Sequence, residues 1–219
     1  MRWWDALMGR SEPARADLDA LFALPSAAVT LQAATDLAPT GVGAVCFRSA
    51  EGGAFAELER DVTQLLDAGG GPPVEVSKDS YGYTWLLVRR ASDAPDMLGD
   101  LVTDLHAVNS SLEAAGFGPS LLCSLISFAA PDGRALALVY LYKQGTFYPF
   151  APLPAGGTGG QAGGRTGGQI GGQAGGQAGG QAQRRDNALE LQVRGAIGGE
   201  LEIEPDLGRW FPLWGAPGL

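Results

Sequence analysis

Residues 121–142 read LLCSLISFAAPDGRALALVYLY, and this stretch decides the fold. Its two halves, 121–128 and 135–142, are almost wholly apolar, and Pro131, Asp132 and Gly133 separate them. Short apolar runs bounded by turn residues are typical of strands that are buried on both faces. The stretch therefore predicts two central strands joined as a β-hairpin.

The segments on either side of this hairpin alternate between strand and helix patterns. Residues 74–76 and 83–88 flank a polar turn and predict a second hairpin. Residues 97–115 carry apolar side chains at helical spacing, with Pro95 near the start and Gly116 just past the end, and predict a long helix. The other predicted elements are strands at 27–33, 43–47 and 146–150, and helices at 17–24 (ended by Pro25), 54–66 and 187–197.

Residues 187–197 support two interpretations. Asn187 and Glu190 resemble a capping box, which favours a helix, whereas the alternation of apolar residues from Leu189 onward also permits a strand. Hairpins followed by helices are typical of an α+β domain. We therefore predict a mostly antiparallel sheet built from β-hairpins alternating with helices packed on one face, together with a short N-terminal helix.

Glycine is concentrated in one low-complexity segment, residues 155–182, which holds fourteen of the 34 glycines. Gly-Gly-Gln-Ala repeats there have almost nothing to bury and maximal backbone entropy, so they predict a disordered insertion loop. Patterned sequence resumes after it. The predicted organisation is a short amphipathic segment at 1–12 and a single α+β domain at 13–219 that the insertion interrupts.

Charge and composition exclude several classes of protein. The chain has 24 Asp and Glu against 15 Lys and Arg, a net charge of −9, which argues against a nucleic-acid partner. It contains no window of 18 consecutive apolar residues and no signal sequence, so we expect a cytoplasmic protein. Cys46 and Cys123 lie in apolar runs and are expected to be reduced, buried thiols, with a disulfide or a reactive thiol as the alternative.

Motifs that carry chemistry are absent from the sequence. A single histidine, His106, and no CxxC or HxxxH spacing argue against a metal site. Neither a phosphate-binding GxxxxGK[ST] loop nor a nucleophile elbow G-x-S-x-G occurs. We therefore expect no enzyme, with no catalytic, cofactor-binding or metal-binding residues.

Clustered aromatic residues are the remaining candidates for function. Core packing explains most such clusters, but Tyr and Trp also anchor interfaces, and a small-ligand pocket is the third possibility. In the N-terminal segment, the aromatic residues are spaced so that they would share one side of a helix. That side could dock on its own domain, on a partner helix or at a membrane interface. The candidate interaction residues are Trp3, Trp4 and Leu7, then Tyr81, Tyr83 and Trp85 on one predicted strand face, and Trp210 and Trp214 in the tail.

Five sequence blocks are distinctive in combination. They are WWDALMGRS at 3–11, LDALFALP at 18–25, DSYGYTW at 79–85, GTFYPFAP at 145–152 and RWFPLW at 209–214. Together they resemble PspAB, a family of PspA-associated proteins found in actinobacteria. The resemblance covers nearly the whole chain except 155–182, which supports the interpretation of that stretch as an insertion.

The resemblance to PspAB implies a function but no active site. It implies a cytoplasmic protein encoded alongside phage-shock protein A, which is a coiled-coil, membrane-remodelling factor of the envelope stress response. The leading hypothesis is a non-enzymatic accessory or adaptor protein that acts with phage-shock protein A. The alternatives are a peripheral membrane-surface sensor that uses the N-terminal Trp segment, and an enzyme with an unrecognised site.

Overall fold

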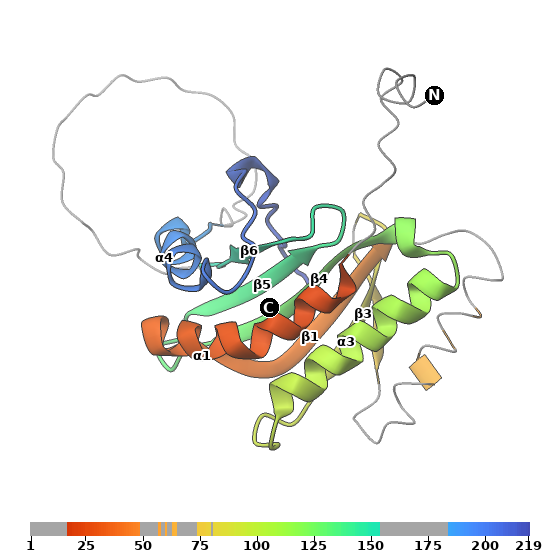
Figure 1. The fold of residues 1–219 in the computed structure, drawn as a ribbon, viewed down its shortest axis with the longest axis horizontal. Coiled ribbons are helices and arrows are strands. Elements are labelled where there is room, and N and C mark those ends of the chain that lie inside the picture. The colour runs from red at the N-terminus through yellow and green to blue at the C-terminus, as the bar shows by residue number, and fades with distance from the viewer. Residues whose placement is uncertain are drawn as a thin grey trace, which may run out of the picture.

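A six-stranded antiparallel sheet forms the centre of the molecule (Figure 1). The computed structural model describes residues 17–48, 74–79, 81–153 and 184–219, together with Glu57, Arg60, Thr63 and Gln64. The strand order is β2-β3-β1-β4-β5-β6. The strands are β1 (Ala38–Arg48), β2 (Glu75–Lys78), β3 (Tyr83–Arg89), β4 (Leu121–Ala129), β5 (Ala135–Leu141) and β6 (Thr146–Phe150).

The predicted central hairpin is confirmed as β4 and β5. Its register runs from Cys123 opposite Leu141 to Ala129 opposite Ala135. Gly133 has a φ of 87° in the connecting turn, a conformation that glycine adopts without steric cost. Residues 136–140 are at most 1% exposed, so β5 is buried on both faces as the apolar pattern requires.

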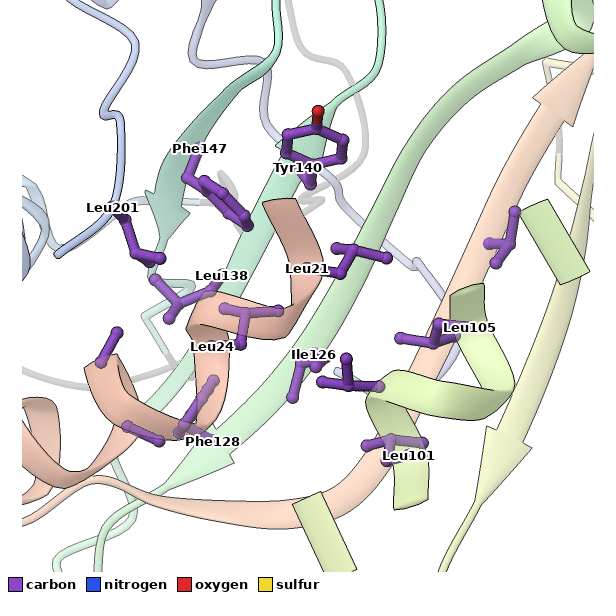
Figure 2. Close-up of a cluster of buried hydrophobic side chains, with 14 of the residues drawn as sticks. Leu21, Leu24, Leu101, Leu105, Ile126, Phe128, Leu138, Tyr140, Phe147 and Leu201 are labelled. Atoms are coloured by element: carbon purple, nitrogen blue, oxygen red, sulfur yellow. The ribbon is translucent and has the colours of Figure 1, made fainter. Parts of the chain in front are cut away.

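Helices cover one face of the sheet, which confirms the α+β prediction. They are α1 (Leu24–Thr35), α3 (Met97–Ala114) and α4 (Asn187–Ile197), with the short 3-10 turns η1 (Leu18–Ala23) and η2 (Gly118–Ser120); a third 3-10 turn, η3 (Leu207–Arg209), lies near the C-terminus. Side chains of these three α-helices belong to one buried apolar cluster with strand residues from this face. Figure 2 shows part of that core: Leu21, Leu24, Leu101, Leu105, Ile126, Phe128, Leu138, Tyr140, Phe147 and Leu201.

The strand predicted at 27–33 is wrong, because these residues form most of α1. Pro25 does not end a helix but occupies the first turn of α1, where its missing N–H has no intrahelical partner to lose. The buried residues Leu24, Ala27 and Leu31 follow helical spacing. The sequence of 27–33 is compatible with both the alternation of a strand and the spacing of a helix. Packing of this segment against the sheet favours the helix.

Together, η1 and α1 form an 18-residue apolar helical segment, Leu18–Thr35. By length and composition it could cross a membrane, although the chain has no uninterrupted apolar window of that length. Core helices of soluble proteins pass the same test. In this fold Leu21, Leu24 and Leu31 are at most 1% exposed, and they pack in the core shared with the sheet.

The helix interpretation of 187–197 is confirmed as α4. Its N-cap is Asp186, one residue before the predicted Asn187, and the Asp186 carboxylate accepts a hydrogen bond from the Leu189 N–H at 3.0 Å. The predicted N-terminal segment 1–12 and the insertion 155–182 lie outside the described residues. Most of the helix predicted at 54–66 does so too, and the four residues described there are helical.

The chain leaves the domain for the glycine-rich segment and returns to it at one place. The Leu153 N–H donates to the Arg184 carbonyl, and the Asp186 N–H donates to the Ala151 carbonyl, both at 2.8 Å. Pro152 and Arg185 form an antiparallel bridge between these two bonds. Paired backbone therefore closes the domain on both sides of the segment, whatever the length of chain between them.

Deleting residues 156–182 should leave the stability of the domain unchanged or slightly raised. The two ends of the deletion already meet in paired backbone. A shorter connection costs less closure entropy, so the free energy of unfolding should rise by no more than about 2 kcal/mol. Urea denaturation of both forms measures the difference. A large fall in stability would contradict the prediction and show that the segment packs on the domain.

Alkaline pH should destabilise the fold, because the hydroxyl groups of buried tyrosines stay protonated in the folded state. Burial, and then the nearby Asp17 charge, raise the pKa of Tyr140 to about 12 from its ordinary 10.0. Burial likewise raises the pKa values of Tyr142 and Tyr148. Above about pH 10 the unfolded chain releases these protons while the folded chain retains them, so the free energy of unfolding falls as pH rises.

Urea unfolding measured at several pH values checks the alkaline loss of stability. The Tyr148→Phe variant serves as the control, since it removes one of the three phenols and should lose stability less steeply. A free energy of unfolding that stays constant between about pH 9 and pH 11 would contradict the prediction.

Candidate functional site

The face of the sheet opposite the helices is covered by residues 204–219, here called the C-terminal tail (Figure 1). The Trp210 ring stacks on Tyr148, with centroids 6.3 Å apart and planes inclined by 26°. The Trp214 ring meets Phe150 edge to face at 5.0 Å. Trp210 is buried in the second apolar cluster of the domain, which includes Cys46, Leu125 and Val139. The prediction that the aromatic tail packs on its own domain is thus confirmed.

The residues at the start of this tail pair with the backbone of β6. The Phe147 N–H donates to the Glu202 carbonyl at 2.7 Å, and the Glu204 N–H donates to the Phe147 carbonyl at 2.8 Å. Further along, the Tyr148 hydroxyl donates to the Phe211 carbonyl at 3.0 Å. This pairing occupies the outer edge of β6, so the edge is not available to a partner strand.

An ion pair between Arg185 and Glu190 joins the base of the insertion, α4 and the tail. Two parallel hydrogen bonds of 2.9 Å link the guanidinium to the carboxylate, whose residue is only 2% exposed. The same guanidinium donates to the Trp210 carbonyl and lies 5.4 Å from the centre of the Phe150 ring. The Glu190 carboxylate also accepts the Ala151 N–H at 2.9 Å. This one side-chain pair therefore links the residue after β6, the chain that returns from the insertion, helix α4 and the C-terminal tail.

The aromatic residues predicted on one strand face have different surroundings. Tyr81 precedes β3 in a turn and is 79% exposed. Tyr83 is half-buried at the start of β3, and Trp85 is 3% exposed. The indole N–H of Trp85 donates to the Asp79 carboxylate at 3.0 Å, which satisfies its polar group inside the fold. Only Tyr81 offers a partner a largely exposed ring.

The tail tryptophans are part of the core rather than a free surface. Trp210 is 4% exposed, and its indole N–H donates to the Glu204 carbonyl at 3.0 Å. Trp214 is partly buried against Phe150. Trp85 and Trp210 are thus explained by core packing and present no exposed ring to a partner. The N-terminal candidates Trp3, Trp4 and Leu7 lie outside the described residues.

An exposed, uncharged stripe lies on the outer side of η1 and α1. It consists of Phe22, Ser26, Val29 and Ala33, and we call it the α1 stripe; Phe22 is 50% exposed and Val29 is 71% exposed. The spacing of four, three and four residues is that of a coiled-coil seam. No charged residue occurs between Asp19 and Asp36. Sequence reasoning missed the stripe because it assigned a strand to 27–33.

A serine, a histidine and an aspartate meet beside the α1 stripe. The His106 ring lies 3.1 Å from the Asp19 carboxylate through Nε2, and 3.4 Å from the Ser110 hydroxyl through Nδ1. Phe22 packs on the same ring, with centroids 5.0 Å apart. In a catalytic triad the carboxylate is buried and orients the imidazole, whereas the Asp19 side chain is 84% exposed. The contact attaches η1 to α3 and does not reproduce a triad.

Metal-binding geometry is also missing from the described part of the chain. Among those residues, no group of three or more His, Cys, Asp or Glu side chains is placed to hold a metal ion. Their surface carries the uncharged α1 stripe, which has the residue spacing that helix–helix contacts use. The geometry therefore describes an α+β domain with an exposed, uncharged stripe on η1 and α1.

Comparison with known families identifies the family of this chain. The chain belongs to the PspAB family, PspA associated protein B, whose sequence model matches residues 1–161 and 177–218. The resemblance found in the five sequence blocks is confirmed. The gap inside the match, residues 162–176, lies within the predicted insertion. Neither a comparison with curated proteins nor one with solved structures found a match.

Replacing Glu190 by Gln should destabilise the domain strongly. The variant leaves the guanidinium of Arg185 partly buried without its countercharge, and breaking such a pair costs about 3 kcal/mol. The matched control is Glu75→Gln, because the Glu75 and Arg89 side chains are 59% and 45% exposed and their 2.9 Å pair should contribute less than about 1 kcal/mol. Urea denaturation compares the two variants. Equal losses of stability would contradict the assigned role of the pair.

Proposed function

We propose that this protein is a non-enzymatic accessory protein that binds phage-shock protein A and acts with it in the envelope stress response. Membership of the PspAB family carries the proposal, because the family name associates its members with PspA. The proposed location is the cytoplasm, at the inner face of the membrane when the partner is there.

The α1 stripe supports a helical partner in particular. Phe22 and Val29 supply exposed apolar area, while Ser26 and Ala33 are small enough to let another helix backbone approach closely. A seam of period 3.5 without charges matches the side of a coiled-coil helix. The family resemblance implies that phage-shock protein A is such a coiled coil. We therefore assign the α1 stripe as its docking surface.

The N-terminal segment is proposed as a second contact. Trp3, Trp4 and Leu7 fall on one side at helical spacing, and tryptophan is among the residues that contribute most to binding energy at interfaces. The same residues suit insertion at a membrane interface, which is the alternative function, a peripheral membrane-surface sensor. A net charge of −9 opposes adsorption to anionic lipid, so the protein partner is favoured.

Val29→Glu should weaken binding to purified phage-shock protein A by at least about tenfold, since it places an unpaired charge in the proposed seam. Val76→Glu is the matched control: it makes the same substitution at an exposed valine, 41% exposed, on edge strand β2. Pull-down titrations of the two variants, with thermal melting to verify folding, provide the comparison. Equal affinity of both variants for the partner would exclude the α1 stripe.

A form lacking residues 1–10 separates the two proposed contacts. Loss of binding on truncation would make the Trp3 and Trp4 segment the main contact. Binding by both forms that still responds to Val29→Glu would place the contact on the α1 stripe. If no form binds phage-shock protein A, the proposed function is overturned, and flotation of both forms with liposomes then tests the membrane alternative.

A further inference from the structure

Two cysteines that are far apart in sequence lie directly opposite each other in the centre of the sheet. Cys46 on β1 pairs with Cys123 on β4, immediately before an irregularity in the strand register between Cys46 and Phe47. Opposed residues on antiparallel strands share a face and have Cα atoms about 4.5 to 5.5 Å apart. Disulfides span Cα separations of about 4.4 to 6.8 Å. The backbone is therefore already placed for a bond between these two residues.

The surroundings of the pair keep it unreactive while the fold is closed. Cys46 is 3% exposed and Cys123 is 6% exposed, and both are free thiols. A thiol–thiol hydrogen bond with Cys123, and then burial, raise the pKa of Cys46 far above its ordinary value. Because the thiolate is the nucleophilic form, a protonated and buried Cys46 reacts slowly.

The C-terminal tail contributes to the apolar cluster that contains the pair. Both thiols belong to the apolar cluster that Trp210 and Ala216 complete. Tyr148 belongs to the same cluster and holds the tail through its hydroxyl bond to the Phe211 carbonyl. Within 204–219 the only regular element is the single turn η3, so the tail has few backbone bonds of its own to keep it in place.

We propose that Cys46 and Cys123 form a reversible intramolecular disulfide when the protein meets a peroxide, and that the C-terminal tail controls the rate. The thiolate of one cysteine attacks the peroxide, so an S–O bond forms, the O–O bond breaks and the leaving hydroxide takes up a proton to become water. The second sulfur then attacks the sulfenic acid, the S–O bond breaks and another water leaves. Two electrons pass from the two sulfurs to hydrogen peroxide, giving one disulfide and two waters. A dithiol reductant reverses the reaction by exchange.

Trp85 provides an internal reporter for the bond. It is the cross-strand neighbour of Cys46 on β3, on the side away from Cys123. A disulfide quenches the fluorescence of an adjacent indole, so oxidation should lower the emission. The bond would also link the two central strands, β1 and β4, and raise the melting temperature by restricting the unfolded chain.

The test exposes the full-length folded protein to excess hydrogen peroxide. The expected product has lost two hydrogen atoms by intact mass, and its peptide map joins the segments containing Cys46 and Cys123. Dithiothreitol should restore the mass and the emission, and the drop in emission should be absent from Trp85→Phe. Cys123→Ser retains one thiol and should show neither the internal link nor the rise in melting temperature.

The proposal fails if the wild-type protein keeps both thiols, forms links only between molecules, or accumulates sulfinic acid at either position. The role of the tail has a separate test in Tyr148→Phe, which removes one hydrogen bond to the tail and keeps the ring. Loss of a bond worth about 1 kcal/mol should speed disulfide formation about fivefold. Oxidation of Tyr148→Phe at the wild-type rate would overturn control by the tail. None of these readouts depends on phage-shock protein A.

Discussion

The structure depends on one constraint: strands β4 and β5 are apolar on both faces, so both faces of the sheet have to be covered. Helices α1, α3 and α4 cover one face. The other face is covered by the aromatic C-terminal tail, which has no long helix or strand of its own. This division explains why the last residues of the chain carry so many aromatic side chains, since a thin cover needs large rings to bury enough area.

The Arg185–Glu190 pair connects this cover to the rest of the domain. It binds the Trp210 carbonyl of the tail, the Ala151 N–H after β6 and the first turns of α4. The pair lies directly after the glycine-rich segment. Because the domain is closed by paired backbone at 151–153 and 184–186, repeats can be added or lost beyond that closure with little effect on the core.

The proposed partner contacts lie outside the buried core. Trp85 and Trp210 are required for packing, and their indole N–H groups are satisfied within the fold. We propose that partner binding uses the exposed, uncharged side of α1 and the N-terminal segment. The opposed thiols of Cys46 and Cys123 belong to the interior, and the response to oxidants proposed for them is separate from partner binding.

Local sequence determined the features that depend on neighbours in the chain: the β4–β5 hairpin, the long helix α3, helix α4, the position of the insertion and the family resemblance. Periodicity, turn residues and caps act within a few residues, so they can be recognised without coordinates. Only the tertiary structure decided whether 27–33 is a helix, which tryptophans are buried, that Arg185 reaches the tail, and that Cys46 lies opposite Cys123. Those outcomes depend on strand order and on packing between distant segments, and no local pattern encodes them.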